Sequence, residues 1–189
     1  MLRIATSNEW VANVMSNFDE FLLDHASCER KASGMALSLV AHYPDRPELV
    51  QAMIALAQEE LEHFRQVWVR INERGLTLGP DTKDHYVRKL RSVLRPNTEE
   101  YFLDRLLVCG VIEARGNERF GLIADALEHG SSLKSFYVNI TRSEAKHKDL
   151  FFELAGKYFS EEQIQPRLTD ILNFEAEVVE ALPLRAALH

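Results

Sequence analysis

Four glutamates that interrupt apolar helical stripes constrain this sequence of 189 residues more than any other feature. Residues three and four apart lie on one face of an α-helix, so apolar residues at those steps mark a buried face. In four segments the apolar series gives way to an acid near its middle: Glu29, Glu60, Glu113 and Glu144. A buried carboxylate costs several kcal/mol unless its charge is compensated, and no Lys or Arg lies on these stripes. The stripes therefore predict bound cations.

Two of the four segments also carry a histidine three residues after the acid, at His63 and His147. A Glu and a His at this spacing share a helix face, and two such pairs with a Glu from each of two further helices hold the metals of di-iron and di-manganese bundles. Two divalent ions would balance four carboxylates. The predicted metal ligands are Glu29, Glu60, His63, Glu113, Glu144 and His147.

The spacing of these residues supports one common site. Glu29 and Glu60 are 31 residues apart, as are Glu113 and Glu144, and a shift of 84 residues carries the first set onto the second. The midpoint of each pair falls at an expected turn, which places the two acids of each antiparallel hairpin at equal height. An isolated Glu-x-x-His is usually a solvated helix face, but two of them with partnered acids at matched spacing indicate a dinuclear centre.

Helix start and stop signals predict an all-α chain. Long helices are expected over 17–42, 46–74, 98–128 and 132–157, with Asp45 capping the second and Gly75 and Gly130 ending the second and third. The capping boxes Thr6-x-x-Glu9 and Ser160-x-x-Gln163 predict a short first helix and a last helix, whose first turn Pro166 would delay or kink.

This order of helices defines the expected fold class. Two short-linked hairpins joined by one long crossover give a ferritin-like four-helix bundle, with short extra helices at the N-terminus, in the crossover and at the C-terminus. Residues 1–189 are expected to form a single domain. No apolar run is long enough to span a membrane, and two cysteines outside any Cys-x-x-Cys give neither a disulfide framework nor a thiolate site, so a cytoplasmic protein is expected.

The donor types limit which metal the site can bind, because oxygen-rich sites with two imidazoles suit iron or manganese. Iron is expected, with manganese as the alternative. His25 lies on the stripe one turn before Glu29 and is interpreted as a hydrogen-bonded core histidine beside the ligands. Four further glutamates lie off the stripes and are expected to be surface or ion-pairing residues: Glu59, Glu62, Glu118 and Glu153.

Beyond this general ligand pattern, the sequence resembles the tRNA 2-methylthio-isopentenyl-adenosine hydroxylases over nearly the whole chain. These are ferritin-like non-haem di-iron monooxygenases. The resemblance rests on four segments: Cys28-Glu29-Arg30-Lys31-Ala32, Glu59-Glu60-Leu61-Glu62-His63, Glu113-Ala114-Arg115-Gly116-Asn117-Glu118-Arg119-Phe120 and Ser143-Glu144-Ala145-Lys146-His147.

The resemblance implies hydroxylation of the isopentenyl side chain of a hypermodified adenosine beside the anticodon. It further implies two iron ions, dioxygen as co-substrate, and two electrons from an external donor or reductase. By the same resemblance Glu60 and Glu144 would bridge the metals, Glu29 and Glu113 would be terminal, and each histidine would bind one iron. Small stripe residues near the ligands, Gly116 among them, would leave room for a prenyl group, or else simply allow close helix packing.

A tRNA substrate requires a local basic surface, because the net charge of −7 gives no general attraction to a polyanion. Positive charge is concentrated in the crossover, where His85 and Tyr86 are interleaved with the basic residues. The expected RNA contacts are Lys83, Arg88, Lys89, Arg91 and Arg95. The solvated face of a short amphipathic helix explains the same residues.

Two other functions stay open on the sequence alone. A ferritin- or rubrerythrin-like protein that oxidises iron or reduces peroxide shares the architecture, although no Cys-rich rubredoxin-like module is present. A non-catalytic helical interaction protein would leave four buried acids unexplained. The expected assembly is a monomer or a small homo-oligomer.

Overall fold

The chain is all-α in a computed structural model that describes all 189 residues. The long helices end within two residues of the predicted bounds, and no helix is long and apolar enough to cross a membrane. The elements in chain order are α1 (Asn8–Ser16), α2 (Phe18–His42), α3 (Pro47–Glu73), α4 (His85–Leu90), the 3₁₀-helix η1 (Arg91–Val93), α5 (Thr98–Ala126), α6 (Ser132–Tyr158) and α7 (Glu161–Ala181).

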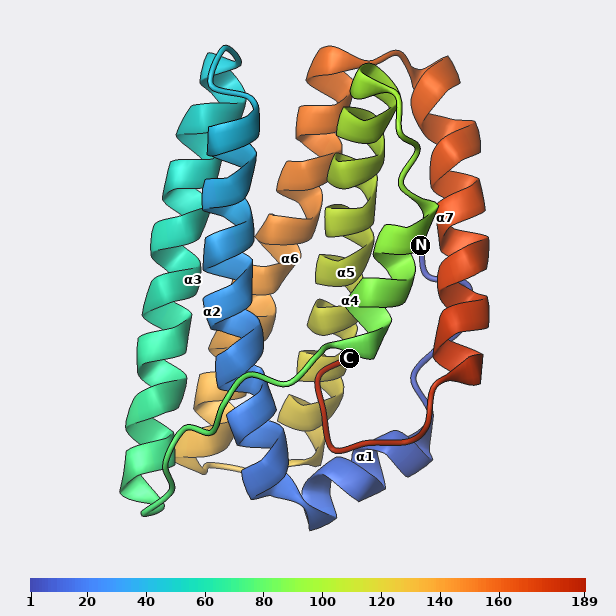
Figure 1. Cartoon of the computed structure of the whole chain (residues 1–189). Coiled ribbons are helices and arrows are strands. Elements are labelled where there is room, and N and C mark those ends of the chain that lie inside the picture. Colours follow the sequence, from blue (N-terminus) through green and yellow to red (C-terminus); the bar gives the residue numbers. More distant parts are fainter. The chain divides into compact units, whose positions relative to one another are not determined.

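The chain divides into two compact units. The first hairpin, α2 with α3, forms one unit from residues 12–82 and 185–188. The other unit comprises residues 1–11, 83–184 and 189, and it contains α4, η1, α5, α6 and α7. Figure 1 shows the two helices of the first hairpin in blue and teal. That residues 1–189 form a single domain stays a prediction.

Apolar side chains at helical spacing hold α2 against α3. Leu22 and Leu39 of α2 and Met53 and Val67 of α3 are completely buried. The helices approach closely enough for the Ser33 hydroxyl to donate a hydrogen bond of 2.8 Å to the carbonyl oxygen of Ala57. Such packing of two long helices fixes the height of every residue along the hairpin.

The ends of α3 confirm one sequence signal and correct another. Gly75 has a φ of +71°. The N–H of Leu76 donates to the carbonyl oxygen of Ile71, and the N–H of Gly75 donates to the carbonyl oxygen of Asn72. These two hydrogen bonds form the Schellman motif that the glycine predicts. The predicted cap at Asp45 is wrong. Helix α3 begins with Pro47 at its first position, where proline's missing N–H costs nothing, and no side chain caps it.

In the other unit, α5 packs against α6 and α7, and α4 packs against α7. The predicted glycine ending of α5 is wrong, because the helix stops at Ala126 and Leu127 is extended. Gly130 does have a positive φ of +81°, but it serves the turn before α6. Ser131 then caps α6 by accepting a hydrogen bond of 3.1 Å from the N–H of Lys134.

The first and last helices show how tertiary contacts compete with local signals. Thr6 does not cap α1: its hydroxyl donates to Glu118 Oε2 at 2.8 Å, and Ser7 Oγ instead accepts from Trp10 N–H at 3.2 Å. The capping box of α7 forms as predicted, with Ser160 N–H donating to Gln163. Pro166 lies inside α7 without delaying its start, because its missing N–H deprives only the carbonyl of exposed Glu162.

A buried ion pair joins α5 to α7 and fixes α4 against them. The Arg115 guanidinium donates to both Glu175 oxygens at 2.8 and 3.1 Å, and neither side chain is exposed. The Tyr86 hydroxyl of α4 donates to the same carboxylate at 3.0 Å. Burial raises the pKa of Tyr86 well above its ordinary value, and the Glu175 charge raises it further, so this phenol remains a donor.

Replacing Glu175 by Leu should destabilise the fold by about 3 kcal/mol, because removal of one partner leaves the buried Arg115 charge poorly compensated. Urea denaturation followed by circular dichroism measures the effect. The matched control is Glu62→Leu, which breaks the exposed pair between Glu62 and Arg65 and should leave the midpoint almost unchanged. Equal shifts for the two variants would contradict a stabilising role for the buried pair.

Candidate metal centre

The hairpin of α2 and α3 contains the first half of the predicted ligand set. Glu29 comes from α2, Glu60 and His63 come from α3, and the ligand atoms they offer all lie within 4.8 Å of one another. The Nδ1 atom of His63 lies 3.3 Å from Glu60 Oε2 and 3.7 Å from Glu29 Oε2. All three side chains are buried, with Glu60 only 1% exposed. We call these three residues the first half-site.

His25 supports the first half-site from one turn earlier on α2. Its Nε2 lies 2.5 Å from Glu29 Oε1, and the imidazole is completely buried. This contact confirms that His25 is a hydrogen-bonded core histidine. The bond engages one oxygen of Glu29, while the other oxygen faces His63.

The hairpin of α5 and α6 contains the second half of the set. Glu113 comes from α5, Glu144 and His147 come from α6, and their ligand atoms also lie within 4.8 Å of one another. His147 Nδ1 lies 3.3 Å from Glu144 Oε2, which repeats the His63 to Glu60 distance of the first half-site. All three side chains are again buried. We call these residues the second half-site.

The halves differ one turn before their first glutamate. His25 precedes Glu29, whereas Cys109 precedes Glu113 at the same spacing. Burial raises the pKa of the Cys109 thiol to about 12, and the neighbouring Glu113 charge also raises it. The thiol is therefore protonated at neutral pH and supplies no thiolate ligand. Both cysteines are free, as predicted.

The donor chemistry of each half-site fits a divalent ion of the iron or manganese type. Two carboxylates and one imidazole converge in a buried place, which is a costly arrangement of like charges without a cation. Oxygen and imidazole donors suit iron and manganese, and a thiolate is absent from both sets. The structure thus brings together the three predicted ligands within each unit, while metal ligation itself stays a prediction.

The glutamates that lie off the stripes have other surroundings. Glu62 pairs with Arg65, and Glu118 accepts hydrogen bonds from Thr6 and Arg115, so both form ion pairs as predicted. Glu59 and Glu153 are exposed. The helical phase therefore separates the buried acids from their sequence neighbours correctly.

The crossover has four exposed basic residues on or beside α4 and η1, and none of them forms an ion pair: Lys83, Arg88, Lys89 and Arg91. Arg95 differs from them. Its guanidinium lies 2.7 Å from Asp104 and 2.7 Å from Glu100, and Asp104 also pairs with Arg167. The structure thus gives Arg95 a role in joining η1 to α5. RNA contact by any of the five residues stays a prediction.

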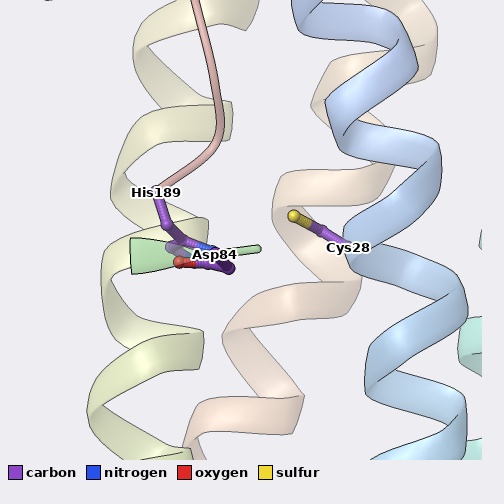
Figure 2. A group of neighbouring side chains, drawn as sticks. All are labelled: Cys28, Asp84 and His189. Carbon is purple, nitrogen blue, oxygen red and sulfur yellow. The ribbon is translucent and has the colours of Figure 1, made fainter. Parts of the chain in front are cut away.

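One cluster near the start of α4 has no signal in the sequence. The imidazole of His189 stacks on the Tyr86 ring with centroids 5.0 Å apart and an interplanar angle of 8°, and its Nδ1 lies 3.2 Å from Asp84 Oδ2. Figure 2 shows Asp84 and His189 side by side; it also labels Cys28, which belongs to α2. Over a hundred residues separate His189 from Tyr86, so no local pattern predicts their contact.

An all-α chain with two long hairpins, each with a buried set of two glutamates and one histidine, has the features of the ferritin-like carboxylate proteins. A solved structure described as "Protein 43 with aldehyde deformylating oxygenase activity from Synechococcus" supports this class. It superposes with a TM-score of 0.93 and 36% identity, covering 100% of this chain and 94% of that one. The predicted fold class is confirmed.

Residues 1–189 match the family described as tRNA-(MS[2]IO[6]A)-hydroxylase (MiaE), and the chain belongs to this family. Two relatives are named tRNA 2-(methylsulfanyl)-N(6)-isopentenyladenosine(37) hydroxylase. The protein from Pseudomonas putida is 33% identical over 93% of this chain and 85% of its own length. The protein from Salmonella typhimurium is 31% identical over 70% of this chain, a match that spans only 48% of that relative. The family resemblance inferred from the sequence is thereby confirmed.

Replacing Glu60 or His147 by Ala should lower the affinity for divalent metal by at least tenfold and so leave less metal bound, because each variant removes a donor from one buried half-site. Inductively coupled plasma mass spectrometry of protein reconstituted with ferrous iron gives the content. Glu62→Ala is the matched control for Glu60→Ala, since Glu62 lies on the same helix outside the half-site. Metal loss from Glu62→Ala as severe as from Glu60→Ala would contradict this division of the glutamates.

Proposed function

We propose that this chain hydroxylates the isopentenyl side chain of 2-methylthio-N6-isopentenyladenosine in tRNA, at the nucleoside next to the anticodon. The observation that carries the proposal is the duplicated, buried half-site in a chain that matches the hydroxylase family from its first residue to its last. The Pseudomonas putida relative supports the same substrate. The enzyme is thus a tRNA-modifying oxygenase.

In this proposal the two half-sites together hold two iron ions. Four glutamates balance the charge of two divalent ions, and the repeated spacing of 31 residues supports one site of two similar halves. Glu60 and Glu144 would be shared by the two ions, Glu29 and Glu113 would each hold one ion, and each histidine would hold one ion. When bound, such a metal pair would supply, together with dioxygen, the oxidising power needed for an unactivated C–H bond.

The overall reaction needs a partner that delivers electrons. One oxygen atom of dioxygen enters the C–H bond to give an alcohol, and the other leaves as water. The balance requires two electrons and two protons, which an external reductase supplies. The two free cysteines lie far apart in sequence, outside any Cys-x-x-Cys motif, so we assign the donor to another protein.

The chain's own residues prepare the site in three ways. Burial of all six ligands keeps bulk water away from the reacting groups. The His25 contact holds one oxygen of Glu29 in place and so fixes its orientation. Because the pKa of Cys109 is high, its thiol stays protonated beside Glu113. The second half-site therefore has oxygen and imidazole donors alone.

The exposed cations of the crossover bind the tRNA backbone in this proposal. Lys83, Arg88, Lys89 and Arg91 have no competing carboxylate partner, so their charges are available to phosphates. Arg95 contributes indirectly through its contact with Asp104, which joins the end of η1 to α5. A local patch of this kind allows RNA binding by a chain with net negative charge.

The purified, reconstituted chain should bind about two irons and convert the isopentenyl nucleoside in tRNA to its hydroxylated form. Mass spectrometry of digested tRNA should show a gain of one oxygen atom when reductant and dioxygen are both supplied. Glu62→Ala should retain this activity and Glu60→Ala should lose it. Iron oxidation or peroxide consumption without any change in the tRNA would favour the ferritin- or rubrerythrin-like alternative.

Replacing Arg88, Lys89 and Arg91 together by Glu should weaken tRNA binding at least tenfold and lower its salt dependence, because phosphate contacts release counterions. Titration of labelled tRNA at several salt concentrations gives affinity and slope. A control with the same charge change replaces three basic residues of α6, Arg142, Lys146 and Lys157, by Glu. Equal losses in both triple variants would show that net charge, and not this patch, governs binding.

A further inference from the structure

Three residues of the unit that contains α4 and α5 surround one small place, and a fourth residue occupies it. Tyr86 forms its wall, Asp84 lies at its edge, Gly116 lies beside it, and the imidazole of His189 fills it. A Cβ atom on Gly116 would lie 3.9 Å from His189 Nε2, so the glycine presents bare backbone to the ring. Figure 2 shows the ring of His189 extending toward Asp84. We call this place the Tyr86 pocket.

The wall of the Tyr86 pocket is rigid. Tyr86 is 1% exposed, and its hydroxyl is held by Glu175, whose carboxylate is held in turn by Arg115. A ring that is fixed before binding loses little conformational freedom when another ring stacks on it. Such a fixed aromatic face is what RNA-binding proteins use to hold an unstacked base.

The groups around His189 could bind a nucleobase, because they offer an aromatic ring for stacking and a carboxylate oxygen for a hydrogen bond. The parallel stack of two rings, with centroids 5.0 Å apart, is the geometry in which an aromatic residue supports a base. Asp84 uses Oδ1 to cap α4, accepting from Val87 N–H at 2.9 Å, and directs Oδ2 at the edge of the imidazole. A carboxylate oxygen in that position accepts a hydrogen bond from the exocyclic N–H of a base.

The pocket also lies at a suitable point along α5. Gly116 follows Glu113 of the second half-site by three residues, slightly less than one helical turn, so the two share a face and differ in height by about 4.5 Å. A base stacked on Tyr86 beside Gly116 would therefore lie within about one turn of α5 from Glu113, a distance that a short substituent can span. Lys83, Arg88 and Lys89 flank Tyr86 in the sequence and suit the phosphates of the same nucleotide and its neighbours.

We infer that the Tyr86 pocket binds the purine ring of an unstacked adenosine, which stacks on Tyr86 and donates its exocyclic N–H to Asp84 after displacing His189. The inference rests on the proposed function, since it assigns the base of that substrate to these residues. In the absence of RNA, the His189 ring then occupies the position of the base and covers the tyrosine. Its ring and the base compete for one place, so the imidazole lowers the apparent affinity for RNA.

The test uses a short RNA anticodon stem-loop with the fluorescent base 2-aminopurine at the target adenosine. Because the amino group of this base is on C2 and not on C6, the probe reports stacking on Tyr86 and not the contact with Asp84. Stacking on Tyr86 should quench this fluorescence, while anisotropy of an end label reports total binding. Tyr86→Leu should abolish the quenching and weaken binding roughly 10- to 100-fold. Tyr86→Phe is the matched control: it loses the hydroxyl but keeps the ring, so it should quench like the wild type.

Variants of His189 test the competition without altering the tyrosine. His189→Ala should tighten RNA binding by about 3- to 10-fold, because it removes the competing ring. His189→Trp should weaken both binding and quenching, because a larger ring covers the tyrosine more firmly. Circular dichroism checks the fold of each variant, and the His189 pair decides the matter if Tyr86→Leu does not fold.

Two results would overturn the inference. One is full quenching by a folded Tyr86→Leu protein, and the other is identical affinity and quenching for wild type, His189→Ala and His189→Trp. Either result leaves the proposed function intact if the wild type still binds and hydroxylates tRNA. Absence of both RNA binding and hydroxylation in the wild type would instead refute the proposed function and, with it, this inference.

Discussion

Repulsion between buried carboxylates is the constraint on which the rest of this structure depends. Glu29 and Glu60 are 4% and 1% exposed, Glu113 and Glu144 are 8% and 3% exposed, and each pair is held with one imidazole inside a few ångströms. Separation would relieve this repulsion, and the long packed hairpins prevent it. The apolar contacts along α2 and α3, and along α5 and α6, thus stabilise an arrangement that would be unfavourable by itself without a cation.

The sequence predicts the parts of the fold that follow from helical periodicity. A residue's position on a stripe gives the helix face on which it lies, and its distance in sequence from the turn gives its height along the hairpin. The proximity of Glu29 and Glu60 therefore follows from the sequence without tertiary information. The same holds for Glu113 and Glu144. Gly75 and the capping box at Ser160 are likewise local, because their partners lie within a few residues.

The sequence fails where a side chain has a choice of partners. Thr6 has the right spacing for a cap, but its hydroxyl donates to Glu118, which is 112 residues away. Asp45 does not cap α3, which begins with a proline at its first position. RNA contact by Arg95 stays a prediction, but the sequence does not show that the buried Asp104 engages its guanidinium. The stack of His189 on Tyr86 depends on contacts between distant residues, which periodicity does not encode.

The carboxylate of Glu175 connects residues that a geneticist would treat as unrelated. It lies on α7, outside both half-sites and outside the basic crossover, but it holds Tyr86 of α4 and Arg115 of α5. Loss of the Glu175 side chain would let α4 and the exposed basic residues of the crossover move as a group. With tRNA bound by the crossover as proposed, a screen for defective tRNA modification would therefore recover changes in α7 that resemble changes in the crossover, although no residue of α7 needs to approach the nucleic acid.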